Sequence, residues 1–281
     1  MKVVFQKFKK EVFIMITLLT LIAGAELVSS IVNAQTLDTL VNMDIHNFFY
    51  KAICLVVIFA FYLLFTYMLI RYQAYFNQKV ATWLRDRISH SIEATSYGRF
   101  YEKNSQTYIS WFTSDLEQIK GNAMNPTFEV IGGIISAVIS AVALFMYHWS
   151  IVLLAAICIV IMAVLPALFS AELTEKTIKV SEANEKFAKS ISDLLSGYDT
   201  LFVFRKLAYL KEKIHEKSVE VGDTHRDFSK SMAKVAVSGG IGNVFSQISV
   251  FILTGYLAYI GEVSIGSILA AMALSSTIFN V

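Results

Sequence analysis

The amino-acid sequence predicts an all-helical (all-α) integral membrane protein, a six-transmembrane-helix bundle with two long cytoplasmic helical arms. The composition, the apolar runs and the one-sided placement of the basic residues predict this fold class. Of the 281 residues, 56% are hydrophobic and only 16% are charged, whereas a soluble domain carries roughly a quarter charged residues. The chain is therefore too apolar for a soluble enzyme, and with 2 Pro and 13 Gly it is neither collagen-like nor disordered.

Six apolar runs approach the ~20 residues that cross the ~30 Å hydrocarbon core of a membrane. The first run is too long and starts too late for an ordinary signal peptide, so we interpret it as a retained span. The sixth reaches the last residue without a basic residue behind it, so we expect a sixth helix that is truncated, with a natural split subunit as the alternative. The predicted spans are residues 12–32, 50–70, 128–147, 149–170, 235–260 and 264–281.

The basic residues predict the orientation, because basic segments near helix ends resist translocation. The 24 lysines and arginines lie before the first span and in residues 71–127 and 171–234, with the single exception of Lys51. The other side has only short connections, at residues 33–49, at His148 and at residues 261–263. We therefore expect a multi-pass protein of a bacterial plasma membrane with a cytoplasmic N-terminus.

The two long basic connections carry helical periodicity and are predicted to be arms rather than loops. Helices of 25–30 residues, at 1.5 Å per residue, would project ~35–45 Å from the bilayer. Basic and acidic residues nearly cancel in the second arm, which indicates a solvated stalk, and a net charge of +2 gives no reason to expect nucleic acid. The apolar heptad positions of the second arm are Leu173, Val180, Phe187 and Leu194, and on the return Leu207, Ile214, Val221 and Phe228.

Each arm must reverse direction at its tip, and both predicted tips are rich in aromatic residues. Rings exposed at a tip leave apolar surface in water, which indicates a docking partner. The alternative is that these rings pack between the two arms of one chain or against a dimer mate. The rings are Tyr108, Trp111 and Phe112 in the first tip, and Phe202 and Phe204 in the second.

The order of these features resembles the transmembrane domain of ATP-binding-cassette (ABC) exporters, and the resemblance covers essentially the whole chain. Residues 100–118 look like the first coupling region of that family, and residues 194–204 look like the second. By this resemblance, short helices at about residues 104–112 and 201–209 would dock into grooves of nucleotide-binding domains. Gln106 and Trp111 depart from the family pattern, which has a glycine and a basic residue there.

The resemblance also implies the coupling residues and the partners. The partners would be a nucleotide-binding domain, fused downstream or separate, and a second transmembrane half in a homodimer or heterodimer within the lipid bilayer. ATP and Mg would bind in the nucleotide-binding domain, and this chain would hold no cofactor. The implied coupling residues are Asn104, Tyr108, Trp111, Phe112, Phe202, Phe204 and Arg205.

The sequence contains no G-x-x-x-x-G-K-[ST] motif, which a P-loop needs in order to cradle phosphate. We therefore expect no catalytic residue here, and ATPase activity only as part of a complete transporter. The five histidines and two cysteines lack the spacing of metal ligands, so no metal site is predicted.

Polar residues inside the spans are the candidates for a substrate pathway, since ionisable groups in a membrane are costly. Glu26 in the first span either faces a central cavity, where it could select cationic cargo, or reaches the outer interface. Asn243 and Gln247, one turn apart in the fifth span, and Tyr256 are further candidates. The small residues around them equally indicate close helix packing.

The predicted function is the membrane-spanning half of an ATP-driven exporter, in which the arm tips couple an ATPase to alternating access of the substrate pathway. Two other classes stay open. A secondary transporter or channel would show several buried charges or broken helices near the midplane. A membrane scaffold with cytoplasmic docking stalks would need neither a substrate pathway nor nucleotide.

Overall fold

The computed structural model describes residues 2–280, which are helical with short turns and contain no β-strand. The all-α fold class predicted from the sequence is therefore confirmed. The chain divides into two compact units, one comprising residues up to Leu153 together with those from Ser249 onward, the other comprising Leu154–Ile248. Two long helices, α8 (Trp149–Ser196) and α10 (Leu207–Tyr259), pass from one unit into the other.

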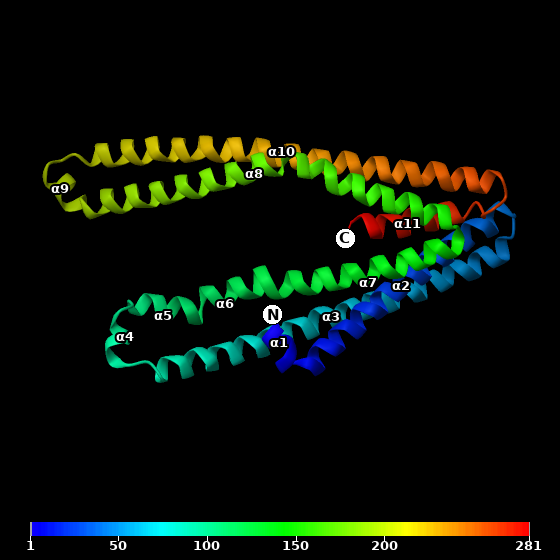
Figure 1. Cartoon of the computed structure of the whole chain (residues 1–281), viewed down its shortest axis with the longest axis horizontal. Coiled ribbons are helices and arrows are strands. Elements are labelled where there is room, and N and C mark those ends of the chain that lie inside the picture. Colours follow the sequence, from blue (N-terminus) through cyan, green and yellow to red (C-terminus); the bar gives the residue numbers. More distant parts are fainter. Residues whose placement is uncertain (1, 281) are drawn as a thin grey trace. The chain divides into compact units, whose positions relative to one another are not determined.

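Four helices form the body of the first unit: α2 (Lys9–Val41), α3 (Ile45–Glu93), α7 (Asn125–Tyr147) and α11 (Ser267–Phe279). α2 packs along α3 and α7, and α11 packs on α7 and α2; α2 and α3 run side by side in Figure 1. Within a bilayer every backbone polar group must be satisfied inside the chain, so apolar segments of this length form helices.

Five helical segments of the described chain are long and apolar enough to cross a membrane: α2, α3, the run Ser105–Tyr147, α8 and α10. They contain the first four predicted spans and all but the last residue of the fifth, which was predicted to end at residue 260. The sixth predicted span contains α11, which has only 13 residues, fewer than the ~20 that cross a hydrocarbon core.

The first connection differs from the sequence expectation, which placed a turn at residues 33–49. α2 continues to Val41 and α3 begins at Ile45, so only three residues separate them. Met43 takes a positive φ of 58°, and Oδ1 of Asp44 accepts a hydrogen bond from the Asn47 N–H at 3.1 Å. This N-cap satisfies an otherwise unpaired donor at the start of α3, and polar residues expected in the turn are instead helical.

The breaks expected at His148 and at residues 261–263 are confirmed. His148 has extended backbone angles between α7 and α8, and its Nδ1 accepts a hydrogen bond from the Ser150 N–H at 3.2 Å. Gly261 follows α10 with a φ of +84°, a conformation that glycine adopts without steric cost.

The return segment of the first arm is not one regular helix. After α4 (Tyr97–Tyr101) it comprises α5 (Ser105–Phe112), α6 (Ser114–Ile119) and a π-helical turn, η1 (Lys120–Met124), before α7. Pro126 has no backbone N–H, so a regular α-helix would leave the Asn122 carbonyl without its donor. The π turn, in which the Asn125 N–H donates to the Lys120 carbonyl, shifts the hydrogen-bond register just before this proline.

The second unit is a helix pair. α8 and α10 run side by side there and are joined at the tip by α9 (Tyr198–Val203), as Figure 1 shows. A Cβ added at Gly242 would lie 3.3 Å from Met162, and one added at Gly239 would lie 3.6 Å from Pro166. Small residues at these positions let the two helices approach closely.

One contact fastens α11 to α2 across almost the whole length of the chain. The Gly266 N–H donates to Oδ1 of Asp38 at 2.7 Å. A Cβ added at Gly266 would lie 1.9 Å from the Ala34 carbonyl oxygen. Because that oxygen belongs to the backbone of α2, it cannot rotate away, and only glycine fits.

We expect Gly266→Ala to destabilise the first unit, because α2 and α11 must separate to admit the methyl group. Overpacking of this kind costs about 1–3 kcal/mol. Gly24→Ala is the matched control, since nothing lies within 4 Å of a Cβ at Gly24. Thermal unfolding in detergent measures both variants, and a Gly266→Ala protein as stable as the control would show that α11 does not pack on α2 in this way.

Candidate coupling tips and pathway residues

The first tip is a turn held together by its own rings. The rings of Phe100 and Tyr108 stack with centroids 4.7 Å apart and planes 10° from parallel, and the Tyr108 hydroxyl donates to the Phe100 carbonyl at 3.1 Å. Trp111 meets Tyr108 edge-on at 5.1 Å, and the Lys103 ammonium lies 4.4 Å from the Trp111 ring centroid. Tyr108 and Trp111 are therefore half-buried residues that shape the tip.

The polar residues of the first tip fix the position of α5. The Asn104 side chain accepts a hydrogen bond from the Gln106 N–H at 3.2 Å and so caps the helix. At the other end, the Phe112 carbonyl accepts a hydrogen bond from Nε of Arg85 at 3.3 Å, which ties α5 to α3. Helix α5, Ser105–Phe112, lies within the predicted range of residues 104–112.

The apolar side chains exposed at the first tip are not the Tyr108, Trp111 and Phe112 that the sequence predicted. Tyr97, Tyr101 and Ile109 are 80%, 67% and 53% exposed, while Phe112 is half-buried. The sequence places all of these residues near the turn, but it does not show which rings stack inside it. Tyr97 and Tyr101, the first and last residues of α4, are exposed tip residues that the sequence analysis did not identify.

The second tip presents an uncovered apolar surface. Phe202, Val203 and Phe204 are 61%, 74% and 71% exposed. The predicted tip helix at about residues 201–209 differs from the observed α9, which begins at Tyr198 and ends at Val203. Arg205 takes a φ of 54°, and the chain reverses there because a left-handed residue ends the helix before α10 begins.

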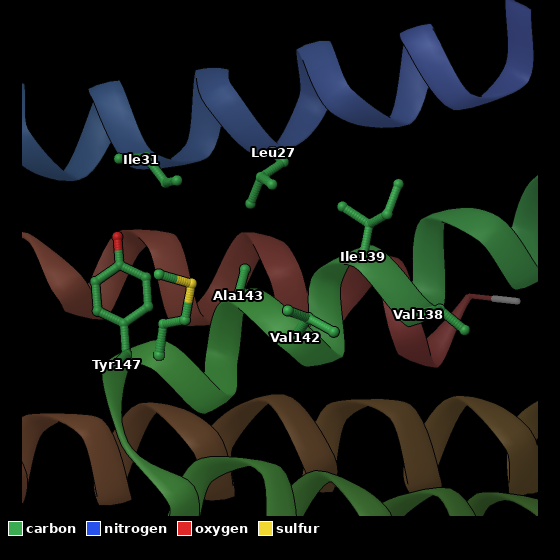
Figure 2. A pocket seen from close by; sticks show the side chains of 8 residues that line it. Leu27, Ile31, Val138, Ile139, Val142, Ala143 and Tyr147 are labelled. Carbon is green, nitrogen blue, oxygen red and sulfur yellow. The ribbon is translucent and has the colours of Figure 1, made fainter. Parts of the chain in front are cut away.

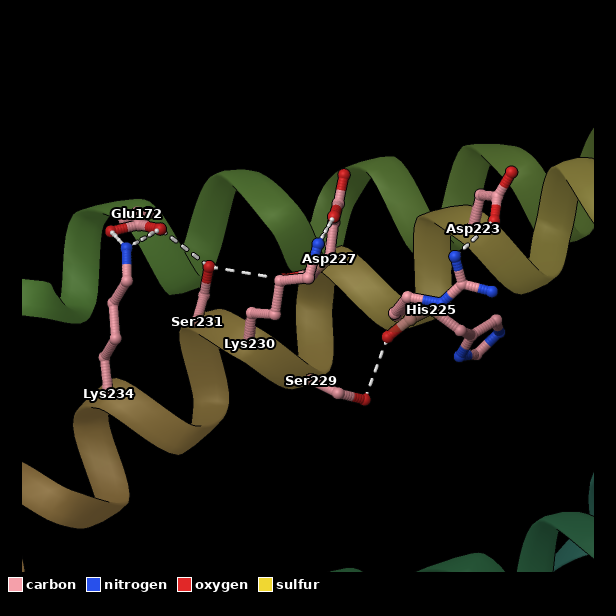
Figure 3. Close-up of polar contacts among 9 residues, drawn as sticks. Glu172, Asp223, His225, Asp227, Ser229, Lys230, Ser231 and Lys234 are labelled. Carbon is pink, nitrogen blue, oxygen red and sulfur yellow. Dashed lines mark hydrogen bonds and ion pairs between the residues drawn. The ribbon is translucent and has the colours of Figure 1, made fainter.

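The two helices of the second arm are clamped together where the arm begins (Figure 3). Glu172 of α8 accepts hydrogen bonds from the Ser231 hydroxyl at 2.8 Å and from the Lys234 ammonium at 2.8 and 3.0 Å, both on α10. The hydrogen bonds from Lys234 and Ser231 hold the pKa of Glu172 below its ordinary value. Asp227 pairs with Lys230 along α10 itself at 2.8 Å, so this ion pair does not link the two helices, whereas His225 of α10 lies 3.5 Å from the Asn184 side chain of α8.

The Glu172 clamp should weaken in acid. Because its pKa is lowered in the folded state, the stabilisation is present above the ordinary carboxyl pKa of about 4 and is lost as the pH falls through the lowered value. Hydrogen exchange of the amides around Ser231 should speed up in that range, beyond the intrinsic pH dependence, and Glu172→Gln should speed it up at neutral pH. The control is Glu185→Gln, an exposed carboxylate elsewhere on α8. Equal protection in both variants would contradict the clamp.

The candidate pathway residues are divided between the two units, with Glu26 and Tyr256 in the first and Asn243 and Gln247 in the second. Glu26 is half-buried on α2 in the first unit, where the Tyr62 side chain of α3 interacts with its carboxyl group. Gln247 donates to Oδ1 of Asn243 at 2.6 Å within α10, in the second unit. Tyr256 belongs to the first unit and is 61% exposed. Glu26 is thus directed toward α3.

An apolar pocket of about 540 Å³ lies between α2 and α7 in the first unit, and Figure 2 shows its side chains. Its volume lies in the range of small-molecule sites. Leu27 and Ile31 line it from α2, and Val138, Val142 and Met146 line it from α7, with Tyr147 at one end. The apolar residues on each helix are spaced four apart, a pattern that the sequence shows. The sequence does not show that the apolar face of α2 lies opposite that of α7.

These features define an all-α, multi-pass integral membrane protein with long helical arms. Residues 12–281 match the family of the ABC transporter transmembrane region. The chain belongs to this family and is the membrane part of an ABC transporter. No individual curated protein matches the chain. Within residues 2–280, no group of three or more His, Cys, Asp or Glu side chains could hold a metal ion.

Proposed function

We propose that this chain is the membrane-spanning half of an ATP-driven exporter. It forms the substrate pathway and couples it to ATPase domains through the arm tips by alternating access. The observation that carries the proposal is the uncovered apolar surface of Phe202, Val203 and Phe204 at the end of the second arm. Aromatic anchors of this kind supply most of the energy of protein interfaces, and membership of the ABC family points to a nucleotide-binding domain as the partner.

The coupling follows from the length of the arm helices. α8 has 48 residues and α10 has 53, and both extend from an apolar stretch to the second tip. A displacement of α9 therefore moves both helices together, and the clamp of Glu172 on Ser231 and Lys234 opposes their separation. The first arm transmits its movement through α3 and the segmented return helix.

The proposal requires partners and an orientation. The N-terminus and both arms lie in the cytoplasm, as the placement of the basic residues indicates. ATP and Mg bind in nucleotide-binding domains, which are fused to the chain or separate from it. A second transmembrane half, identical or different, completes the pathway. Membership of the ABC family favours this function over a secondary transporter or a scaffold.

The double variant Phe202→Ala/Phe204→Ala tests the second tip in the complete transporter reconstituted in vesicles. We expect basal ATP hydrolysis to persist while ATP-driven transport falls by roughly tenfold or more, as expected when anchors worth ~2 kcal/mol are lost. Val219→Ala, which removes an exposed apolar side chain from the shaft of α10, is the matched control and should transport normally. Normal transport by the double variant would contradict docking at this tip.

Glu26 is proposed to act in the substrate pathway through its carboxylate, with Tyr62 positioning it. Glu26→Gln keeps the shape and removes the charge, so export of cationic cargo should fall relative to neutral cargo of similar size. Tyr62→Phe, which removes the hydroxyl group alone, should give a smaller change of the same kind. Parallel losses for both cargoes, or none, would exclude charge selection at Glu26.

A further inference from the structure

The chain begins with a hook, which we define as residues 2–11. Helix α1 (Lys2–Lys7) precedes α2, and the two are separated at Phe8, whose backbone angles of φ −112° and ψ 41° are not helical. Figure 1 shows a sharp bend between α1 and α2. The hook thus changes direction just before the first predicted span.

The hook is firmly docked on the first unit. Phe8 is 6% exposed and meets the rings of Phe76 and Trp83 of α3 edge-on, at centroid distances of 6.1 and 5.8 Å. Phe5 packs against Phe128 of α7 at 5.9 Å. Aromatic pairs in such orientations stabilise beyond the area they bury, so these contacts hold the backbone of the hook against α3 and α7.

The apolar anchors alternate with lysines that point into solvent. Lys7, Lys9 and Lys10 are exposed. Glu11, the only acid of the hook, is bonded to Lys79 of α3, so it is already neutralised. Lys7, Lys9 and Lys10 belong to none of the ion pairs within residues 2–280. Three positive charges within four residues therefore lack an ion-pair partner in the described chain.

The position of the hook suits a membrane surface. It directly precedes the apolar stretch of α2, whose first turns carry Phe13 and Ile14, 70% and 41% exposed. Lysines beside exposed apolar groups at the entry of a membrane helix lie near the lipid headgroups and attract anionic lipids. A free anion would satisfy the lysines but would gain nothing from Phe13 and Ile14.

We propose that the N-terminal hook binds the phosphate group of an anionic phospholipid through Lys7, Lys9 and Lys10. Occupancy also steadies the base of the first arm, because Phe8 and Lys79 connect the hook to α3. This inference rests on the membrane location of α2 and is independent of the proposed exporter function.

Native mass spectrometry of the full-length protein in detergent tests this proposal, with phosphatidylglycerol and phosphatidylcholine titrated separately. We expect phosphatidylglycerol to be preferred. Lys7→Gln/Lys9→Gln/Lys10→Gln should weaken its binding by roughly tenfold or more, whereas the three Lys→Arg changes should retain it. The matched control is Lys186→Gln/Lys189→Gln/Lys211→Gln, which removes three exposed lysines from the second arm.

Two results would overturn the proposal. An equal loss of phosphatidylglycerol binding in the hook and arm variants would assign the preference to net charge rather than to the hook. Displacement of the lipid by inorganic phosphate at comparable concentration would identify the hook as a site for free phosphate. Retained binding in the arm variant, loss in the hook variant and resistance to inorganic phosphate would together support a lipid site.

Discussion

The structure depends on the need to pair every backbone N–H and C=O group within the membrane. Only continuous helices meet this need in an apolar sequence that forms no closed barrel. In this chain the same helices continue far beyond the membrane: α3, α8 and α10 have 49, 48 and 53 residues. At 1.5 Å per residue each is about 75 Å long, far more than the ~30 Å hydrocarbon core of a membrane requires. The proposed coupling is a consequence of this continuity.

Contacts between neighbouring helices then determine how the two units are built. In the first unit, the close approach of Gly266 to Ala34 and Asp38 holds the short helix α11 on α2. In the second, Gly239 and Gly242 let α8 and α10 approach, and Glu172 joins them where the arm begins. Apolar attraction between helices is weak in lipid, so small residues and polar contacts of this kind take its place.

Most of the fold could be predicted from the sequence, because apolar runs and basic residues follow directly from the cost of burying charge in lipid. The breaks at His148 and Gly261 were predicted correctly. The turn after α2 was not, because the polar residues after position 33 continue the helix beyond the membrane. The π turn before Asn125 depends on the missing N–H of Pro126, and the helical periodicity of the first arm gives no indication of it.

The tips were predicted only in part. The sequence identified the aromatic residues, but Tyr108 and Trp111 turn out to pack within the first tip while Phe202 and Phe204 are exposed in the second. Ring stacking depends on the path of the turn, which residue type and spacing do not determine. The apolar pocket between α2 and α7 was missed for a related reason, since it forms only when two stripes far apart in the sequence face each other.

In the proposed mechanism, movement of the arm tips and access to the pathway are one motion. A spin label at Tyr198 and a second label at the corresponding tip of the other half of the complete transporter, measured with and without ATP in a hydrolysis-deficient background, test this coupling. We expect ATP to shorten the distance between the labels and to change the accessibility of a label near Tyr147. The coupling would be contradicted by an unchanged distance between the tips in the hydrolysis-deficient protein, provided that this protein binds ATP and that its counterpart with intact hydrolysis transports normally.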